Sequence, residues 1–363
     1  MEIVFEINHP GQVHLLKHVY HVLTQNGNCI SVFTKDDRII KRLLEKSEMP
    51  YKILGKKGNG IYGKLFKQML FDFKVWKHVK RNSVTIGIGS SITNDHVSSV
   101  SSMKSIHLSD DDENVVPLML KFSYPFTNTI LAPDSLTFKK FSEKTVNYAG
   151  THELAYLHPN RFQPDKNVLN KAGLKKDEPY FIMRFVALKG HHDKGHKGIT
   201  IKQKRSLINL LKPHGKIIIT SESKIESEFE EYRLPVPPEE IHSLLYYSKI
   251  FLGDSQTMTS EAAVLGVPAL KCNSFARLLS VPNELEDKYG LCYSYKPQEF
   301  DKFYNHLSSL LKKKNLKEEW KEKRSKLLGD KIDVSAFFVW FIENYPESAR
   351  IMKENPDYQY NFK

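Results

Sequence analysis

The chain has 363 residues, of which 40% are hydrophobic and 26% are charged, a composition typical of a globular protein with more than one core. No apolar run approaches the roughly 18 residues of a membrane span, and the three cysteines are scattered, which favours a reducing, cytoplasmic setting. The net charge of +12 indicates an anionic partner, such as a phosphorylated substrate. Lysine outnumbers arginine and zinc-finger or ribonucleoprotein motifs are missing, so we expect no nucleic-acid partner.

Short apolar runs alternate with helical patterns in the first part of the chain. A helix is predicted over residues 11–27, because Val13, Leu16, Val19, Tyr20 and Leu23 share one face and Asn26-Gly27 is a typical C-cap. A second helix is predicted over residues 36–47. The strands that we expect are at residues 2–8, 29–34, 84–90, 105–109, 128–133 and 145–150. Strands that alternate with helices in this way predict a parallel sheet.

The pattern breaks at residues 150–174, which are rich in proline and polar side chains. A second set of strands follows at residues 180–186, 216–221, 249–255, 268–273 and 291–295, before a helical C-terminal part. We therefore predict two doubly wound α/β domains that face each other across a cleft. The predicted divisions are a first Rossmann-like acceptor domain at 1–152, a crossing at 153–178, a nucleotide-sugar domain at 179–335 and a helical segment at 336–363. Ligands of such sheets bind beyond the carboxyl ends of the strands.

The turn after the strand at 249–255 concentrates polar side chains at the start of a helix. Asp254, Ser255, Gln256 and Thr257 lie in this turn, and Glu261 lies one turn inside the helix. A helix N-terminus with neutral donors suits a diphosphate, while a carboxylate behind it suits a ribose diol. The alternative is ordinary helix capping, which uses the same residue types. On local pattern alone the two interpretations stay open.

The segment "PPEEIHSLLYYSKIFLGDSQTMTSEAAVLGVPAL" resembles the nucleotide-sugar segment of GT-B enzymes. These enzymes include UDP-N-acetylglucosamine 2-epimerases and the glycosyltransferase that completes the lipid-linked peptidoglycan precursor. Most of the chain resembles a GT-B-like family of bacteria and archaea without assigned function. The matching motifs are "NHPGQVHLLK", "DDEN", "GTHELAYLHPNRFQPD" and "RFVALKGHHDKGHKG".

The resemblance implies a role for several residues of the second domain. Glu261 would hold the ribose, and Ser255, Gln256 and Thr257 would hold the diphosphate. It further implies that the backbone of Val236 contacts the uracil with His242 nearby, and that Ser221 lies in a loop that touches phosphate.

A basic segment, "RFVALKGHHDKGHKG", begins with Arg184 at the end of the predicted strand at 180–186 and continues beyond it through His192. Cationic groups at a strand's carboxyl end would stabilise the charge that grows on a diphosphate leaving group. A metal site is the weaker interpretation, because "HHDKGH" lacks the i, i+4 helical pairing of zinc ligands. The third interpretation is a basic loop that is exposed to solvent and has no ligand.

The first strand-helix turn, "NHPGQVHLLKH", predicts the acceptor side of the site. His9 and Gly11 lie in the turn and His14 in the first helical turn, where a neutral histidine can act as general base. Asp111, in the acidic run "DDDE" after the strand at 105–109, is the other candidate base. Structural alternatives are a polar helical face for the histidines and a surface loop for the acids.

Residues 56–81 carry eight basic side chains against one acid, beside a stripe of Phe66, Met69, Leu70, Phe73 and Trp76. Such a segment suits an anionic membrane surface. A core-packed helix with a solvated basic face is an equally strong interpretation.

Three functions are compatible with these features. The preferred one is a metal-independent glycosyltransferase that uses a nucleotide sugar, UDP-linked in our expectation, in surface polysaccharide or glycolipid assembly, where the acceptor is a carbohydrate or lipid-phosphate-linked. The nucleotide sugar would be a substrate, with no further cofactor. The second is a 2-epimerase. It is disfavoured because the segments that correspond to that family's catalytic acids, "GIGSSIT" and "FSYPFTNTI", contain neither aspartate nor glutamate. The third is a non-catalytic nucleotide-sugar binding protein.

Overall fold

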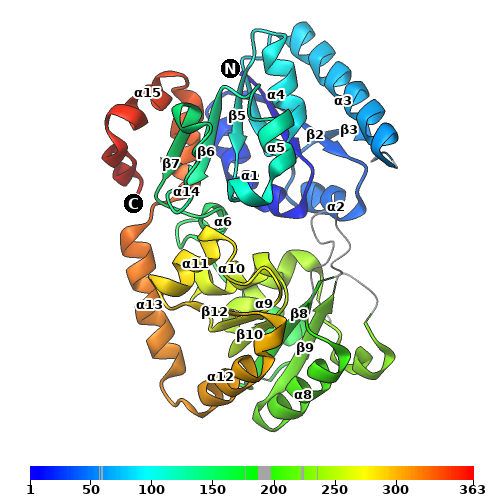
Figure 1. Cartoon of the computed structure of the whole chain (residues 1–363), viewed down its shortest axis with the longest axis vertical. Helices are drawn as coiled ribbons and strands as arrows, with labels where there is room; N and C mark the ends of the chain where they lie inside the picture. Colours follow the sequence, from blue (N-terminus) through cyan, green and yellow to red (C-terminus); the bar gives the residue numbers. More distant parts are fainter. Residues whose placement is uncertain (57, 59, 176, 187–197, 222–224, 235) are drawn as a thin grey trace. The chain divides into compact units, whose positions relative to one another are not determined.

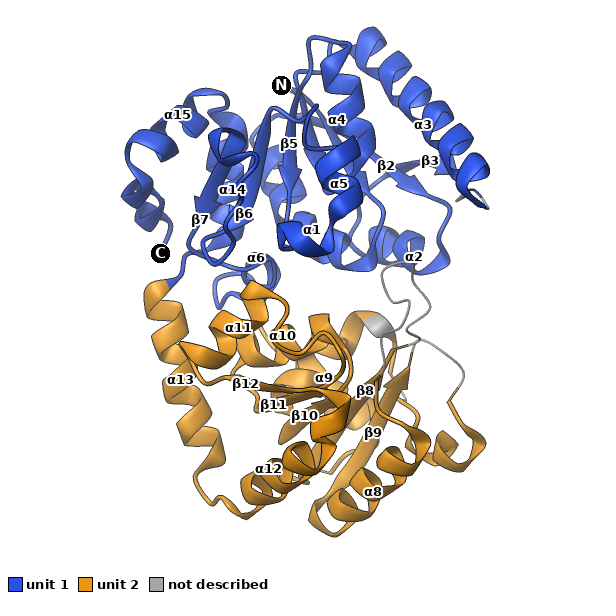
Figure 2. Ribbon diagram, viewed as in Figure 1, with its two compact units in different colours: residues 1–161, 331–363 blue, residues 162–330 orange. Residues whose placement is uncertain are grey.

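The computed structural model describes residues 1–363 except 57, 59, 176, 187–197, 222–224 and 235. By their internal contacts these residues form two compact units (Figure 2). The first unit contains residues 1–161 and 331–363, and the second contains residues 162–330. The chain therefore returns to the first unit for its last helices.

The first unit is built on a parallel sheet of seven strands in the order β3-β2-β1-β4-β5-β6-β7 (Figure 1). The central strands are apolar and buried because helices cover both faces of such a sheet. The strands are β1 (Glu2–Ile7), β2 (Cys29–Lys35), β3 (Tyr51–Gly55), β4 (Ile86–Gly89), β5 (Lys104–Leu108), β6 (Thr129–Pro133) and β7 (Thr145–Tyr148). The strand order reverses between β1 and β4, and a ligand site is expected at such a point.

Helices join these strands and complete the first unit. They are α1 (Pro10–Gln25), α2 (Arg38–Lys46), α3 (Gly60–Asn82), α4 (Ile92–Ser99), α5 (Pro117–Phe122), α6 (Leu154–Leu157), α14 (Val334–Glu343) and α15 (Glu347–Glu354). The apolar helix α14 packs against α1 and α6, which ties the end of the chain to this unit. The long helix α3 packs against α4 and the edge strand β3.

The second unit has a parallel five-stranded sheet in the order β12-β11-β10-β8-β9. Its strands are β8 (Tyr180–Phe185), β9 (Lys216–Ser221), β10 (Ile250–Gly253), β11 (Ala269–Cys272) and β12 (Cys292–Tyr295). Its helices are α7 (Asn167–Lys171), α8 (Ile201–Leu211), α9 (Ile241–Tyr247), α10 (Gln256–Leu265), α11 (Ser280–Asp287), α12 (Phe300–Lys312) and α13 (Leu316–Asp330). Here the order reverses between β8 and β10.

The predicted fold class, two doubly wound domains with parallel sheets, is confirmed. Every strand predicted from an apolar run is present within a residue or two of its expected bounds. Strand β3 was missed, because "YKILG" is short and carries a lysine between its apolar residues. It is an edge strand, and an edge strand does not need the continuous apolar run of a central strand, which helices cover on both faces.

Candidate functional site

The strand order of the second unit brings the ends of β8 and β10 together. Gly253 of β10 pairs with Arg184 of β8, at the point where the order reverses. A Cβ at Gly253 would lie 2.1 Å from the carbonyl oxygen of Arg184, so only glycine allows this approach. The polar turn that begins at Asp254 therefore starts at the expected ligand edge of the sheet.

Two of the polar side chains in this turn, those of Asp254 and Ser255, accept hydrogen bonds from backbone N–H groups of the protein. The carboxylate of Asp254 accepts hydrogen bonds from the backbone N–H groups of Val186 (2.7 Å) and Ile199 (3.4 Å). Burial raises the pKa of Asp254 to about 6, against the effect of these N–H groups. Ser255 is the N-cap of α10, and its Oγ accepts from the N–H of Met258 at 3.4 Å. The capping interpretation thus accounts for Ser255.

The next two residues keep polar groups available for a ligand. Thr257 is exposed in the first turn of α10. Gln256 is half-buried, its Oε1 accepts from the ammonium group of Lys271, and its Nε2 has no hydrogen-bond partner among the described residues. Burial lowers the pKa of Lys271 to about 8. The start of α10 therefore presents neutral donors at the positive end of a helix dipole.

Glu261 lies behind these donors and is paired with a histidine. Nε2 of His242 in α9 is 2.9 Å from Oε1 of Glu261 in α10, and both residues are buried. The ring of Phe162 contacts His242 edge-on, with ring centroids 6.4 Å apart. Val236, whose backbone was expected to contact the uracil, is also buried. The pair holds the carboxylate of Glu261 in one orientation, as a site for a ribose diol requires.

The remaining residues predicted for the donor side lie on the neighbouring strands. Nη1 of Arg184 donates to Oγ1 of Thr220 at 2.7 Å, which fixes the guanidinium at the end of β8. Ser221 is the last residue of β9, adjacent to β8. His192 lies outside the described residues.

In the first unit, the end of β1 begins the predicted acceptor side. His9 is the N-cap of α1, and its Nδ1 accepts from the N–H of Gly11 at 3.2 Å. His14 is half-buried in the first turns of α1, and its ring centroid is 5.4 Å from that of Tyr156 in α6. These three residues therefore do cluster at the end of one strand.

A buried carboxylate lies beside this turn and was not identified from the sequence. Glu6 of β1 accepts from Nδ2 of Asn8 (2.8 Å) and from Oγ of Ser91 (2.6 Å), which follows β4. Its second oxygen has no hydrogen-bond partner among the described residues. Polar residues thus join β1 and β4 where the strand order reverses.

Asp110 and Asp111, which follow β5, meet residues that follow β7. Nδ1 of His152 lies 3.2 Å from Oδ2 of Asp110. Desolvation opposes protonation of His152, but Asp110 outweighs it and raises the pKa of His152 above its usual value. Desolvation by surrounding protein atoms, followed by repulsion from Asp110, raises the pKa of Asp111 to about 7, although Asp111 keeps contact with solvent. Burial likewise raises the pKa of Glu153 to about 7.

His152 and Glu153 were missed as candidate catalytic residues. They lie in "GTHELAY", which spans the predicted boundary between the first domain and the crossing. A usable signal was present, since two titratable residues closely follow a predicted strand. In this cluster the pKa values of the Asp111 and Glu153 carboxyls are raised to about 7, while the pairing of Asp110 with His152 lowers the pKa of the first and raises that of the second. Neighbouring groups whose pKa values are shifted in this way are typical of sites that transfer protons.

Within the described ranges, no group of three or more His, Cys, Asp or Glu side chains has the arrangement of a metal site. None of the described helices combines the length and the apolar character needed to cross a membrane.

The chain is similar to known proteins in sequence and in fold. It is 29% identical over 182 residues to the uncharacterized protein MJ0665 of Methanocaldococcus jannaschii, covering 46% of this chain and 51% of that protein. The chain therefore spans about half the length of this relative.

Solved structures match over nearly the whole chain. The S. aureus MnaA–UDP structure has a TM-score of 0.66 with 12% identity, covering 96% of this chain and 97% of that one. UDP-GlcNAc 2-epimerase of Neisseria meningitidis bound to UDP-GlcNAc has a TM-score of 0.60 with 12% identity, covering 90% and 100%. The Streptomyces sp. SF2575 glycosyltransferase SsfS6 in complex with thymidine diphosphate has a TM-score of 0.58 with 11% identity, covering 94% and 99%.

These likenesses show the fold, which is that of GT-B glycosyltransferases and of the epimerases related to them. The model of the family described as "Protein of unknown function (DUF354)" matches residues 1–334, and the chain belongs to this family.

Proposed function

We propose that this protein is a glycosyltransferase that moves a sugar from a UDP-linked donor to an acceptor hydroxyl. The observation that carries the proposal is the buried pair of Glu261 and His242 behind the polar first turn of α10. A fixed carboxylate one turn behind neutral donors fits a ribose followed by a diphosphate. The solved structures with this fold include complexes with UDP, UDP-GlcNAc and thymidine diphosphate, which supports a nucleotide sugar as the ligand class.

The proposed reaction is a direct displacement at the anomeric carbon. A base, His14 or Asp111, takes the proton of the acceptor hydroxyl, and the acceptor oxygen bonds to the anomeric carbon. The bond from that carbon to the diphosphate oxygen breaks, and UDP leaves with the additional negative charge. Arg184, Ser221 and the N-terminus of α10 stabilise this charge, so the reaction is proposed to need neither a metal ion nor a further cofactor.

The acceptor class and the location are part of the same proposal. A carbohydrate or lipid-phosphate-linked acceptor, in surface polysaccharide or glycolipid assembly, agrees with a chain of net charge +12. We place the enzyme in the cytoplasm, at the inner face of a membrane.

One observation favours 2-epimerase chemistry as a second candidate. An epimerase removes and returns a proton at carbon 2 of the sugar, and this needs an acid and a base. The sequence lacks the expected acids of that family, but Asp110, Asp111, His152 and Glu153 supply titratable groups of both kinds. The cluster therefore keeps this reaction open to test.

Proton NMR of UDP-GlcNAc incubated with the protein in deuterated water separates the candidates. We expect the sugar to bind and to keep its proton at carbon 2, with at most slow release of UDP when no acceptor is present. Deuterium at carbon 2 would replace the transferase by the epimerase. A non-catalytic binding protein would be favoured if UDP-GlcNAc binds but no acceptor leads to release of UDP. In that case the Asp110→Asn and His14→Ala variants should bind UDP-GlcNAc as tightly as the unchanged protein does.

A further inference from the structure

Helix α3 is apolar on two opposite faces. On one face Phe71, Val75 and Val79 are buried in a cluster with Val4 of β1 and Leu54 of β3. This face holds the helix on the sheet and accounts for the core-packing interpretation of its sequence. The other face needs a separate explanation.

The second apolar face of α3 is exposed. Tyr62 is 89% exposed, Phe66 61%, Met69 64% and Phe73 57%. Their spacing of three and four residues places them in one row along the helix. We refer to these four residues as the α3 stripe. A row of large apolar side chains at this exposure marks an interaction surface, since monomeric proteins rarely present one.

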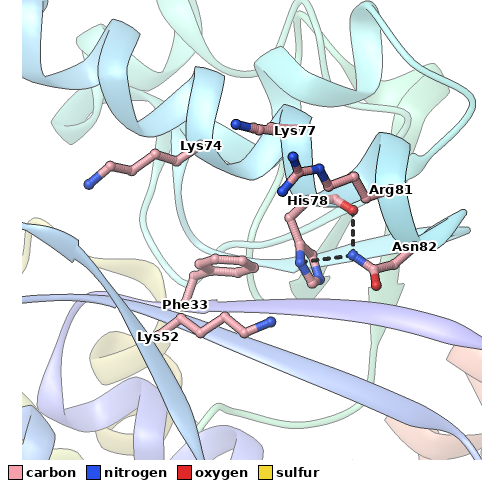
Figure 3. Close-up of a pocket in the computed structure, with 7 residues that line it drawn as sticks. All are labelled: Phe33, Lys52, Lys74, Lys77, His78, Arg81 and Asn82. Atoms are coloured by element: carbon pink, nitrogen blue, oxygen red, sulfur yellow. Dashed lines mark hydrogen bonds between the residues drawn. The ribbon is translucent and has the colours of Figure 1, made fainter.

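Cationic side chains continue the row and gather around a pocket at the end of α3. Lys77 and Arg81 follow Phe73 by four and eight residues. The pocket has a volume of about 420 Å³, and Figure 3 shows Lys77, Arg81 and Lys74 of α3 above Lys52 of β3 and Phe33 of β2. We refer to it as the basic pocket. Its lining residues are Phe33, Lys52, Lys74, Lys77, His78, Arg81 and Asn82, with no acid among them.

The cations of the basic pocket are only partly satisfied within the protein. Lys74 donates to the carbonyl of Leu54 at 2.6 Å, and the ammonium group of Lys52 lies 5.6 Å from the Phe33 ring centroid. Lys77 and Arg81 form no ion pair with another described residue. Four adjacent cations in a pocket whose described lining contains no acid favour an anion there.

We propose that α3 docks the protein on an anionic membrane surface. The α3 stripe inserts at the boundary between headgroups and acyl chains, and the basic pocket binds the phosphate of an anionic lipid. An anionic membrane accounts for both the α3 stripe and the basic pocket, because amphipathic helices at membranes combine buried apolar area with attraction to anionic lipids. A second copy of this chain fits less well, since a two-fold interface built on this surface would gather two sets of the four cations with no acid from the pocket lining to offset them.

Vesicle sedimentation with the full chain tests this inference without any nucleotide, so it fails or holds independently of the proposed reaction. We expect binding to vesicles of phosphatidylcholine with about 30% phosphatidylglycerol to exceed binding to pure phosphatidylcholine about tenfold or more at low salt. The K77E/R81E variant should lose this preference. F66D/F73D should lose binding to both vesicles. All four side chains are exposed. Phe73 also stacks on Trp76, which packs against the core cluster under α3, so circular dichroism and thermal unfolding must show that F66D/F73D keeps its fold.

The matched control is K314E/K317E, which makes the same change in net charge on exposed residues of the second unit and should bind as the unchanged protein does. Equal loss of binding in K77E/R81E and this control would show a general charge effect and overturn the basic pocket. Sedimentation of the unchanged protein as a dimer that F66D/F73D converts to a monomer, without vesicle binding, would assign the stripe to a second copy. Saturable binding of soluble glycerol phosphate without vesicle binding would assign the pocket to a free phosphate ester.

Discussion

Nε2 of His242 lies 2.9 Å from Oε1 of Glu261, and each side chain is more than nine-tenths buried. The pair links α9 to α10 behind the first turn of α10. A carboxylate that is already held in place loses little conformational entropy when it accepts hydrogen bonds from a ribose. This relationship carries the proposed donor site.

Replacing Glu261 by alanine should weaken UDP binding by about tenfold to a hundredfold, because the ribose hydroxyls lose a charged acceptor. Isothermal titration calorimetry with UDP measures the change. Glu318→Ala makes the same substitution on an exposed residue of α13 and is expected to bind UDP normally. Unchanged affinity of Glu261→Ala would remove the ribose from this position.

Replacing His14 by alanine should leave UDP affinity unchanged while turnover falls about a hundredfold, as for the loss of a general base. Turnover is followed as UDP release from the donor, and affinity by titration with UDP. A variant with ordinary turnover would transfer the role of base to Asp111. Lys17→Ala, on the same helix, serves as the control for damage to α1.

Replacing Asp110 by asparagine should lower the pKa of His152. Desolvation alone lowers this pKa, and the charge and hydrogen bond of Asp110 reverse the effect. An NMR titration of the histidine side chains measures the shift, and Asp112→Asn should leave it in place. A His152 pKa that is the same in both variants and in the unchanged protein would mean that the pair does not form in solution.

The buried ammonium group of Lys271 should make the stability of the protein depend on pH. Burial lowers its pKa in the folded state to about 8, below the ordinary value of 10.5 that the unfolded chain restores. Between these two values the unfolded state binds more protons, so the free energy of unfolding rises with pH from about 8 to 10.5. The cost of the buried charge is fully present below pH 8 and amounts to roughly 3 kcal/mol.

The K271M variant should lack this rise, as urea unfolding at pH 7 and at pH 10 would show. The difference between the two pH values is compared within each variant, because methionine also removes the hydrogen bond to Gln256. Lys314→Met is the control at an exposed lysine. A rise of equal size in K271M would assign the pH dependence to other groups.

The sequence by itself determined the elements whose signals are local. Apolar runs such as "KIFLG" predicted buried strands, because strands covered on both faces need an apolar residue at every position. Ser255 and Gly266 mark the two ends of α10 through capping chemistry that involves only nearby backbone groups. The polar turn between Gly253 and Glu261 was therefore found correctly before any fold was known.

Only the tertiary structure decided which distant residues meet. His152 reaches Asp110 because β7 and β5 lie in the same sheet with β6 between them, and strand order is not written in the local pattern. Helix α3 shows the same limit in another way. Its periodicity reveals apolar residues on both faces, but it does not say which face a neighbouring element covers. Packing on β1 and β3 covers Phe71, Val75 and Val79 and leaves the α3 stripe exposed, because burial depends on the partners that the fold supplies.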